Sequence, residues 1–388
     1  MKYISFWLLA LLPLPLAAPT KSKEPVVKVS VVTELTKAVF NVTVDTRASG
    51  VLQYNTADAT AVAGMEYVPV SGSIAYPSGR SKHQVEVPLY RNNSSDAAKM
   101  FRMQIQDRNV ASAAIGAVPF QVIATGDIAC RANLSRVVKP DACQHEKVAA
   151  LARSRNFDAF FALGDIQYPS GSLADFQSSF DVSFGFAKDR VKPAVGNHEW
   201  ETPNAQGYRD YFGERFQTNG DLWYSFDVGS WHVVSLDSSC AKANCRREAA
   251  WLARDIANSR TRCTAVVMHH PPAGSGSFSA NSNVMTLWRQ VVQSGVTVAL
   301  AGHEHSYERL SAVSETGRKP RRGERGVPLF IVGSGGVGFH SAGKKSSLQQ
   351  YRATNVFGVL GLSLEAGSYT YEYQTTEGKI LDAGRASC

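Results

Sequence analysis

Two histidines lie two positions apart in the stretch GHEHSYER, residues 302–309, which follows the apolar run GVTVAL. Four other apolar runs end in polar motifs: GDIA at 126–129, GDIQY at 164–168, GNHE at 196–199 and VMHH at 267–270. A turn explains one such motif equally well, but five of them in one region indicate a shared site. The residues that could do chemistry are Asp127, Asp165, Asn197, His198, His269, His270, His303 and His305.

Side chains of these types commonly bind metal ions in proteins. Carboxylate oxygen and imidazole nitrogen bind zinc, iron and manganese, and oxygen donors suit the harder ions. Two aspartates, an asparagine and at least three histidines exceed the needs of one ion. The sequence therefore predicts two ions that share a carboxylate, which is typical of enzymes that hydrolyse phosphate esters.

The apolar runs have the pattern of strands with helices between them. Strand patterns include PFQVIATGD (119–127), FDAFFALGD (157–165) and VTVALAGHEH (296–305), and helical patterns occupy 143–155 and 247–260. This alternation predicts an α/β domain with buried sheets from about residue 119 to residue 388. Ligands of such folds gather beyond the carboxyl ends of strands, where the polar motifs stand.

Residues 26–118 have a different pattern. Short alternating runs such as VFNVTVD and HQVEVPLY are separated by turn clusters, which predicts an antiparallel β-sandwich. The segment 52–89 resembles a Calx-beta domain in the order of its T-A-x-x-G-x-x-Y core, its Ser-Gly turn and the alternating strand that follows. Many Calx-beta domains bind calcium through acidic clusters. Here VEVPLY continues into RNNSSDAAKMF, with few acids, so a structural sandwich is expected.

The chain begins MKYISFWLLALLPLPLAAPTKSK. A lysine, an apolar run and two small residues form the pattern of a secretory signal peptide, assigned to residues 1–18. The run is short for a membrane span, and an uncleaved N-terminal anchor is the alternative. A secreted or periplasmic location is expected, with no membrane span after signal cleavage.

An exported chain with an even number of cysteines is expected to form disulfides. Six cysteines allow 15 pairings, so any single pairing is a preference. Thiolate ligation of a metal is the alternative, although no C-x-x-C pair is present. Sequence proximity favours the pairs Cys130–Cys143, Cys240–Cys245 and Cys263–Cys388.

The formal net charge is +8, and the basic residues are scattered apart from GRKPRRGERG at 317–326. A basic balance suits anionic substrates and also aids solubility. Nucleic-acid binding would need basic and aromatic residues interleaved on one face, and no such stripe is present. Nucleic acid is therefore not an expected partner, and the oligomeric state stays open.

In order along the chain, the five polar motifs resemble the motif blocks of purple acid phosphatases, a branch of the calcineurin-like metallophosphoesterases. The resemblance covers the chain from about residue 120 onward. It implies an α/β (α+β) metallophosphoesterase sandwich of mixed sheets flanked by helices over 119–388, preceded by the all-β sandwich.

The family pattern implies a role for each motif residue. Asp127, Tyr168 and His305 would hold the first ion, and Asn197, His269 and His303 the second, with Asp165 as the bridge. His198 would face the substrate, and His270 would be a phosphate contact or a support for a ligand. A phenolate favours Fe(III) at the first site, with Fe(II), zinc or manganese at the second. The alternative for Tyr168 is a core tyrosine of its turn.

The resemblance implies an exported, acid phosphatase-like enzyme that hydrolyses small phosphate monoesters by attack of a metal-bound hydroxide. Two alternatives stay open. One is a phosphodiesterase or nucleotide pyrophosphatase of the same fold, and the other is an adhesion or matrix-binding protein with a vestigial site. No G-x-S-x-G elbow and no Walker-type loop is present to indicate a different hydrolase or nucleotide-binding protein.

Overall fold

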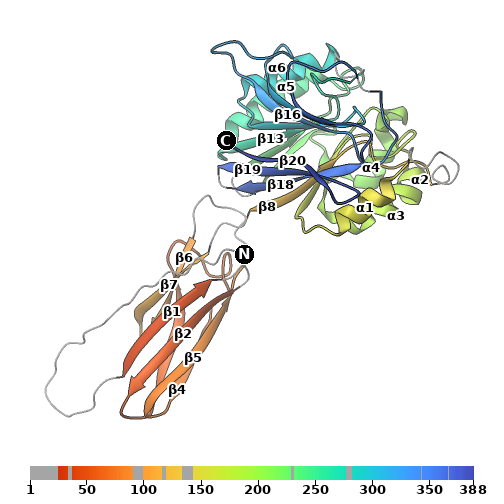
Figure 1. Ribbon diagram of the computed structural model, residues 1–388. Helices are drawn as coiled ribbons and strands as arrows, with labels where there is room; N and C mark the ends of the chain where they lie inside the picture. Colours follow the sequence, from red (N-terminus) through yellow and green to blue (C-terminus); the bar gives the residue numbers. More distant parts are fainter. Residues whose placement is uncertain are drawn as a thin grey trace. The chain divides into compact units, whose positions relative to one another are not determined.

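The computed structural model describes residues 25–33, 37–90, 99–115, 119–132, 143–228, 231–276, 282–341, 343–365 and 367–388. The chain divides into two compact units, Met1–Val118 and Pro119–Cys388 (Figure 1). The signal peptide assigned to residues 1–18 lies outside the described residues. No helix among the described residues is long and apolar enough to cross a membrane.

The first unit is a sandwich of two antiparallel sheets. One sheet has the order β1-β2-β5 and the other β4-β3-β6-β7. Alternation along the strands points one set of side chains inward, where Phe40 and Tyr67 both pack against Phe101. The strands are β1 (Val26–Thr33), β2 (Lys37–Thr46), β3 (Gly50–Asp58), β4 (Ser71–Tyr76), β5 (Gly79–Pro88), β6 (Lys99–Ile105) and β7 (Arg108–Ile115).

The second unit contains two mixed sheets. The six-stranded sheet has the order β10-β9-β8-β18-β19-β20, and the seven-stranded sheet has the order β11-β12-β13-β14-β16-β15-β17. Its strands are β8 (Phe120–Thr125), β9 (Ala159–Leu163), β10 (Val191–Ala194), β11 (Tyr224–Val228), β12 (Trp231–Ser235), β13 (Cys263–Val267), β14 (Val298–Ala301), β15 (Tyr307–Val313), β16 (Val327–Val332), β17 (Gln349–Ala353), β18 (Gly358–Glu365), β19 (Ser368–Thr375) and β20 (Ile380–Ser387).

Apolar side chains fill three layers of this second unit. Phe161 of one sheet and Leu300 and Phe330 of the other belong to a single core cluster between the sheets. Helices cover the two outer faces, so the layers run helix, sheet, sheet, helix (Figure 1). The helices are α1 (His145–Arg153), α2 (Leu173–Asp175), α3 (Asp181–Phe184), α4 (Gln206–Phe212), α5 (Cys245–Asn258) and α6 (Met285–Gln293).

The predicted fold class is confirmed: an α/β sandwich of mixed sheets flanked by helices, preceded by an all-β sandwich. The helical patterns at 143–155 and 247–260 correspond to α1 and α5. Strands such as β9, β13 and β14 are buried along their whole length, which explains why their sequences are continuous apolar runs.

All six cysteines are paired. The structure forms the disulfides Cys130–Cys143, Cys240–Cys245 and Cys263–Cys388, the three pairs that sequence proximity favours. Thiolate ligation of a metal is therefore wrong for these residues in this structure, because each sulfur is already bonded to another sulfur.

Candidate metal centre

Parallel strands bring the polar motifs to one place. Strands β8, β9 and β10 are mutually parallel neighbours in the six-stranded sheet, as are β12, β13, β14 and β16 in the other. Because parallel strands end at the same edge, residues that follow them meet there. Asp127, Asp165, Asn197 and His198 follow strands of the six-stranded sheet. His269, His270, His303 and His305 follow strands of the seven-stranded sheet.

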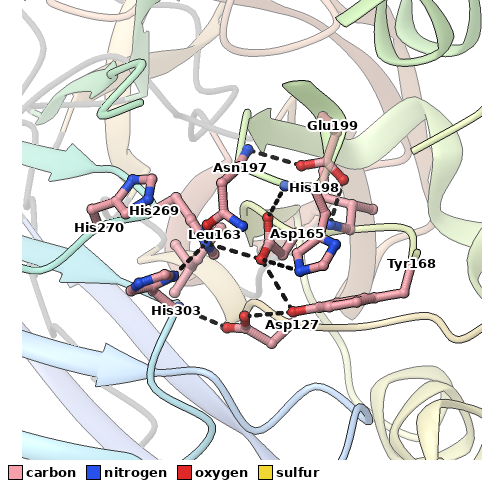
Figure 2. A network of polar contacts seen from close by, with 12 residues as sticks. Asp127, Leu163, Asp165, Tyr168, Asn197, His198, Glu199, His269, His270 and His303 are labelled. Atoms are coloured by element: carbon pink, nitrogen blue, oxygen red, sulfur yellow. Dashed lines mark hydrogen bonds and ion pairs between the residues drawn. The ribbon is translucent and has the colours of Figure 1, made fainter. Parts of the chain in front are cut away.

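The Tyr168 hydroxyl lies at the centre of the first group of donors. It is 3.0 Å from Asp127 Oδ1, 3.1 Å from Asp165 Oδ2 and 3.2 Å from His305 Nε2. His305 Nε2 in turn is 3.3 Å from Asp127 Oδ1. The three residues that the resemblance assigns to one ion therefore lie around a single point, together with the proposed bridging carboxylate. Figure 2 shows the contacts of Tyr168 with Asp127 and Asp165.

His269 Nε2 is the centre of the second group. It lies 3.2 Å from Asn197 Oδ1, from His303 Nδ1 and from Asp165 Oδ2. Asp165 Oδ2 is thus within hydrogen-bond distance of both centres (Figure 2). The structure brings together all seven residues predicted as ligands, and their roles as ligands stay predictions.

Burial and neighbouring charges shift these groups in opposite directions. Burial raises the pKa of the Asp127 and Asp165 carboxyls, but the facing histidines outweigh it and the net pKa of both is lowered. Burial lowers the pKa of His269, but Asp165 outweighs it and raises that pKa to about 9. Burial, reinforced by the two carboxylates, raises the pKa of Tyr168 well above its usual range. The two buried carboxylates are therefore held ionised by the histidines that face them.

Three of the predicted ligands adopt a backbone conformation that side chains disfavour. Asp127, Asp165 and His303 have φ angles of 58°, 45° and 71°, in the left-handed region. Such conformations cost about 1–3 kcal/mol each and persist where the surrounding structure enforces them, commonly at functional sites. Each of these residues follows a glycine at a strand end. The strained turns aim the carboxylates and the imidazole into the common site.

Two glycines are required because other residues approach their backbone closely. Gly164 has φ +80°, and a Cβ there would lie 2.6 Å from the His269 ring. A Cβ on Gly196 would lie 2.2 Å from the Asp165 backbone nitrogen. The glycines of GDIQY and GNHE therefore let the two strand-end loops approach the metal centre.

His198 is fixed at the rim of the site. Its Nδ1–H donates to the Pro169 carbonyl oxygen at 2.5 Å, and its ring centroid is 4.1 Å from that of Tyr168. The other ring nitrogen, Nε2, is 3.8 Å from Asp165 Oδ2, and the side chain is 32% exposed. The ring is therefore held by one nitrogen while the other faces the site, as expected for a substrate-facing histidine.

His270 is more deeply buried. Its Nδ1 is 3.1 Å from Ser238 Oγ, and its ring centroid is 4.5 Å from that of His303. Burial, then the neighbouring His269 and His303, lowers its pKa to about 2. The ring is therefore neutral and packed behind His303, and its assignment to catalysis stays a prediction.

The sequence analysis assigned no role to three residues that support the site: Glu199, Ser238 and His340. Buried Glu199 accepts backbone N–H groups of Ile166, Gln167 and Gly196, at 2.8, 3.1 and 2.8 Å, and so ties the loops after β9 and β10 together (Figure 2). Glu199 is the last residue of the GNHE motif, and its place beside Asn197 and His198 could have indicated it.

The other two contact histidines of the site. Ser238 accepts the backbone N–H groups of both His269 and His270. The His340 ring stacks on His305 at 3.7 Å between centroids. Neither belongs to one of the five motifs, so their roles follow from packing between elements that are distant in sequence.

Comparison with family models agrees with this geometry. Residues 120–307 match the model of calcineurin-like phosphoesterases, and residues 24–126 match the model of Calx-beta domains. The match to calcineurin-like phosphoesterases lies in the second unit, and the match to Calx-beta domains lies mainly in the first.

The relatives of the chain include purple acid phosphatases. The chain is 32% identical over 158 residues to purple acid phosphatase 23 of Arabidopsis thaliana, which covers 36% of this chain and 33% of that protein. It is 23% identical over 270 residues to a nucleotide pyrophosphatase/phosphodiesterase of Hordeum vulgare, covering 59% of this chain and 71% of that protein. The chain thus spans a third of the first relative's length.

A solved structure shares the fold. Purple acid phosphatase PPD1 from yellow lupin seeds superposes with a TM-score of 0.58 at 14% identity, covering 94% of this chain and 74% of that one. At this identity the similarity supports the architecture. The expected resemblance to purple acid phosphatases and to Calx-beta domains is confirmed.

Proposed function

We propose that the chain is an exported phosphatase that hydrolyses small phosphate monoesters at a centre of two metal ions. The observation that supports this proposal is the convergence of seven donor side chains about two neighbouring points that share Asp165 Oδ2. They are Asp127, Asp165, Tyr168, Asn197, His269, His303 and His305.

The donor set fits two ions. Carboxylate, phenol and amide oxygens together with imidazole nitrogens suit iron, zinc and manganese. Asp127 and Asp165 are 0% and 2% exposed, and their ion pairs within the described part of the chain are with histidines. Buried carboxylates need compensation by cations, which metal ions would provide.

We assign the ions by donor type. Tyr168, Asp127 and His305 would hold Fe(III), because phenolate and carboxylate are hard anionic ligands. Asn197, His269 and His303 would hold Fe(II), zinc or manganese, and Asp165 would be shared. When bound, two such ions supply Lewis acidity toward phosphate and lower the pKa of bound water.

The protein side chains supply position and a proton. Glu199 fixes the Asp165 and Asn197 loops relative to each other through its three N–H partners. His198 Nδ1–H is occupied by Pro169, so Nε2 is the atom positioned to hydrogen-bond a phosphoryl oxygen or to protonate the departing alkoxide. A general acid at this position would act without becoming a ligand.

A phosphodiesterase or nucleotide pyrophosphatase is the second candidate, because the relative from Hordeum vulgare carries that name and the match covers 71% of it. The experiment is to purify the full chain, measure bound metal, and compare kcat/KM on 4-nitrophenyl phosphate and methyl 4-nitrophenyl phosphate. Bound iron with preference for the monoester supports the proposal. Preference for the diester supports the second candidate, and a metal-free protein inactive on both esters would contradict both.

A further inference from the structure

An exposed basic loop projects from the seven-stranded sheet of the second unit. Residues 314–326, here called the basic arm, connect β15 to β16. Within GRKPRRGERG, five basic residues face one acidic residue, a net charge of +4 in a chain whose formal net charge is +8. The five basic side chains are all exposed and are those of Arg318, Lys319, Arg321, Arg322 and Arg325.

The charges of the basic arm are uncompensated. None of its five basic side chains forms an ion pair or hydrogen bond among the described residues. The arm also contains two acids, which leaves it a net charge of +3. Glu324 accepts the backbone N–H of Arg321, and Glu315 accepts a hydrogen bond from Gln293 Nε2. Isolated basic residues are common on protein surfaces. A dense group of unpaired basic residues creates a positive potential that attracts an anionic partner.

The backbone of the arm is held in shape. Ser314 N donates to the Arg318 carbonyl, and Arg318 N donates to Ser314 Oγ. A second turn closes where Glu324 N donates to the Arg321 carbonyl. The two turns place Gly317 and Gly323 at φ +74° and +84°. A loop that is already ordered loses less conformational entropy when its side chains bind a partner.

Packing fixes the arm on the helical face of the sheet. A Cβ on Gly317 would lie 3.1 Å from the Pro272 carbonyl oxygen, and the Trp288 indole of α6 donates to the Ser314 carbonyl. Arg325 lies beside Gly295, which precedes β14, whereas the metal centre lies where β14 ends. The four residues of β14 span about 13 Å, so that end of the arm and the site lie at opposite ends of the strand.

The chemistry of the arm favours one class of partner. The segment 314–326 contains no aromatic residue on which a base could stack. It also contains no large apolar side chain that could insert into a bilayer core. Clusters of four to eight Lys and Arg residues attract the headgroups of anionic lipids, and the attraction needs no insertion.

We propose that the basic arm docks the protein reversibly on an anionic lipid surface through its headgroup phosphates. Four of its five cations are arginines, whose planar guanidinium groups bind phosphate oxygens in pairs. Contact through the Arg325 end would place the lipid surface at the end of β14 opposite the metal centre. The association is electrostatic and weakens with salt.

The test is cosedimentation of the full chain with vesicles of phosphatidylcholine mixed with phosphatidylglycerol, and with vesicles of phosphatidylcholine alone. It compares the wild type with two variants that each lose three positive charges. The arm variant combines Arg318→Gln, Arg321→Gln and Arg322→Gln. The control variant changes three exposed basic residues of the same unit and combines Lys242→Gln, Arg246→Gln and Arg254→Gln.

The wild type and the control variant should bind the mixed vesicles at low salt, bind phosphatidylcholine weakly, and dissociate at about 1 M salt. The arm variant should bind the mixed vesicles about 100-fold more weakly, since each basic residue near the surface contributes about fivefold. Its thermal unfolding and ester hydrolysis should match the wild type.

Three outcomes overturn the proposal. Equal loss in both variants would mean that net charge, rather than the arm, drives the attraction. Absence of wild-type binding to the mixed vesicles would remove the partner. Tighter binding to duplex DNA than to the vesicles, lost in the arm variant, would make the arm a nucleic-acid surface.

Discussion

The Asp165 carboxylate lies between the two groups of candidate metal ligands. Asp165 Oδ2 lies within hydrogen-bond distance of Tyr168 Oη and His269 Nε2, so one carboxylate oxygen connects the two groups of donors. Asp165→Asn keeps the size of the side chain but removes its negative charge and replaces one carboxylate oxygen with a donor NH2 group. We expect loss of phosphoesterase activity and of about one bound ion per chain. Metal analysis and ester hydrolysis would check this, and a variant with full metal content and normal turnover would exclude the two-ion assignment.

Substitution of His198 tests a role in catalysis separately from a role in metal binding. In His198→Asn the side-chain amide replaces Nδ1–H as the donor to Pro169, while the atom corresponding to Nε2 is lost. We expect kcat to fall by about 10²–10⁴-fold, the range for a positioned acid or base, with bound metal unchanged. Metal content by mass spectrometry beside kcat would decide, because a fall in metal would show that His198 is a ligand.

The proposal of Fe(III) at the first group of donors depends on Tyr168. A phenolate bound to Fe(III) gives a visible charge-transfer band, and Tyr168→Phe removes the only oxygen of that side chain that could donate. We expect the band of the iron-loaded, oxidised protein to disappear while the fold persists. Tyr224→Phe is the matched control, because its hydroxyl is also buried but donates to the Pro193 carbonyl outside the site. A band that survives in Tyr168→Phe would mean that another ligand produces the colour.

At the scale of elements, the positions that the sequence predicted are strand ends. Continuous apolar runs followed by Gly-Asp, Gly-Asn or Gly-His predicted β8, β9, β10 and β14 together with the residues that meet beyond them. Glycine was informative there because the backbone turns sharply, as at Gly164. Each of these signals is local, so it is visible in a short window of sequence.

Supports that act between distant elements could not be predicted in this way. Ser238 follows β12, and its hydroxyl oxygen accepts the backbone N–H groups of His269 and His270 after β13. The His340 ring stacks on His305 from a loop 35 residues later. Serine and histidine occur in loops for many reasons, so neither residue type indicates a partner. These contacts depend on strand order, and strand order was not encoded in any one motif.

A network of charged side chains joins β11, β12 and α5. His232 of β12 lies 2.6 Å from Asp227 of β11 and 2.8 Å from Asp255 of α5. Burial lowers the pKa of His232, but the two aspartates outweigh it and the net pKa is raised. Since the folded pKa exceeds the unfolded value of about 6.5, the imidazolium stabilises the fold most below that pH.

This network predicts a pH-dependent stability. The difference in unfolding free energy between the wild type and His232→Gln should be largest at about pH 6 and should shrink as the pH rises through the folded pKa. Urea unfolding of both proteins from about pH 6 to about pH 9 measures it. A difference that stays constant across this range would mean that His232 contributes by packing and not by charge.

At the scale of the molecule, the second unit is held by contacts between two sheets whose strands are far apart in sequence. The cluster between the sheets includes Phe161 of β9, Phe330 of β16 and Tyr373 of β19. Cys263 begins β13 in the seven-stranded sheet, and Cys388 follows β20 at the edge of the six-stranded sheet. Their disulfide therefore connects the two layers covalently at a sequence separation of 125.

The Cys263–Cys388 disulfide should contribute more to the free energy of unfolding than Cys240–Cys245, whose sequence separation is only five. Chain entropy predicts that closing the longer loop restricts the unfolded chain by about 5 kcal/mol and the shorter loop by about 2 kcal/mol. Cys263→Ala with Cys388→Ala should therefore lower the unfolding free energy more than Cys240→Ala with Cys245→Ala, by about 3 kcal/mol. Each pair is replaced completely, so neither variant carries a free thiol. Urea unfolding of the two double variants makes the comparison internal to one protein. Equal losses would mean that the unfolded chain keeps the two sheets together without the disulfide, or that the short loop stores stability in its native contacts.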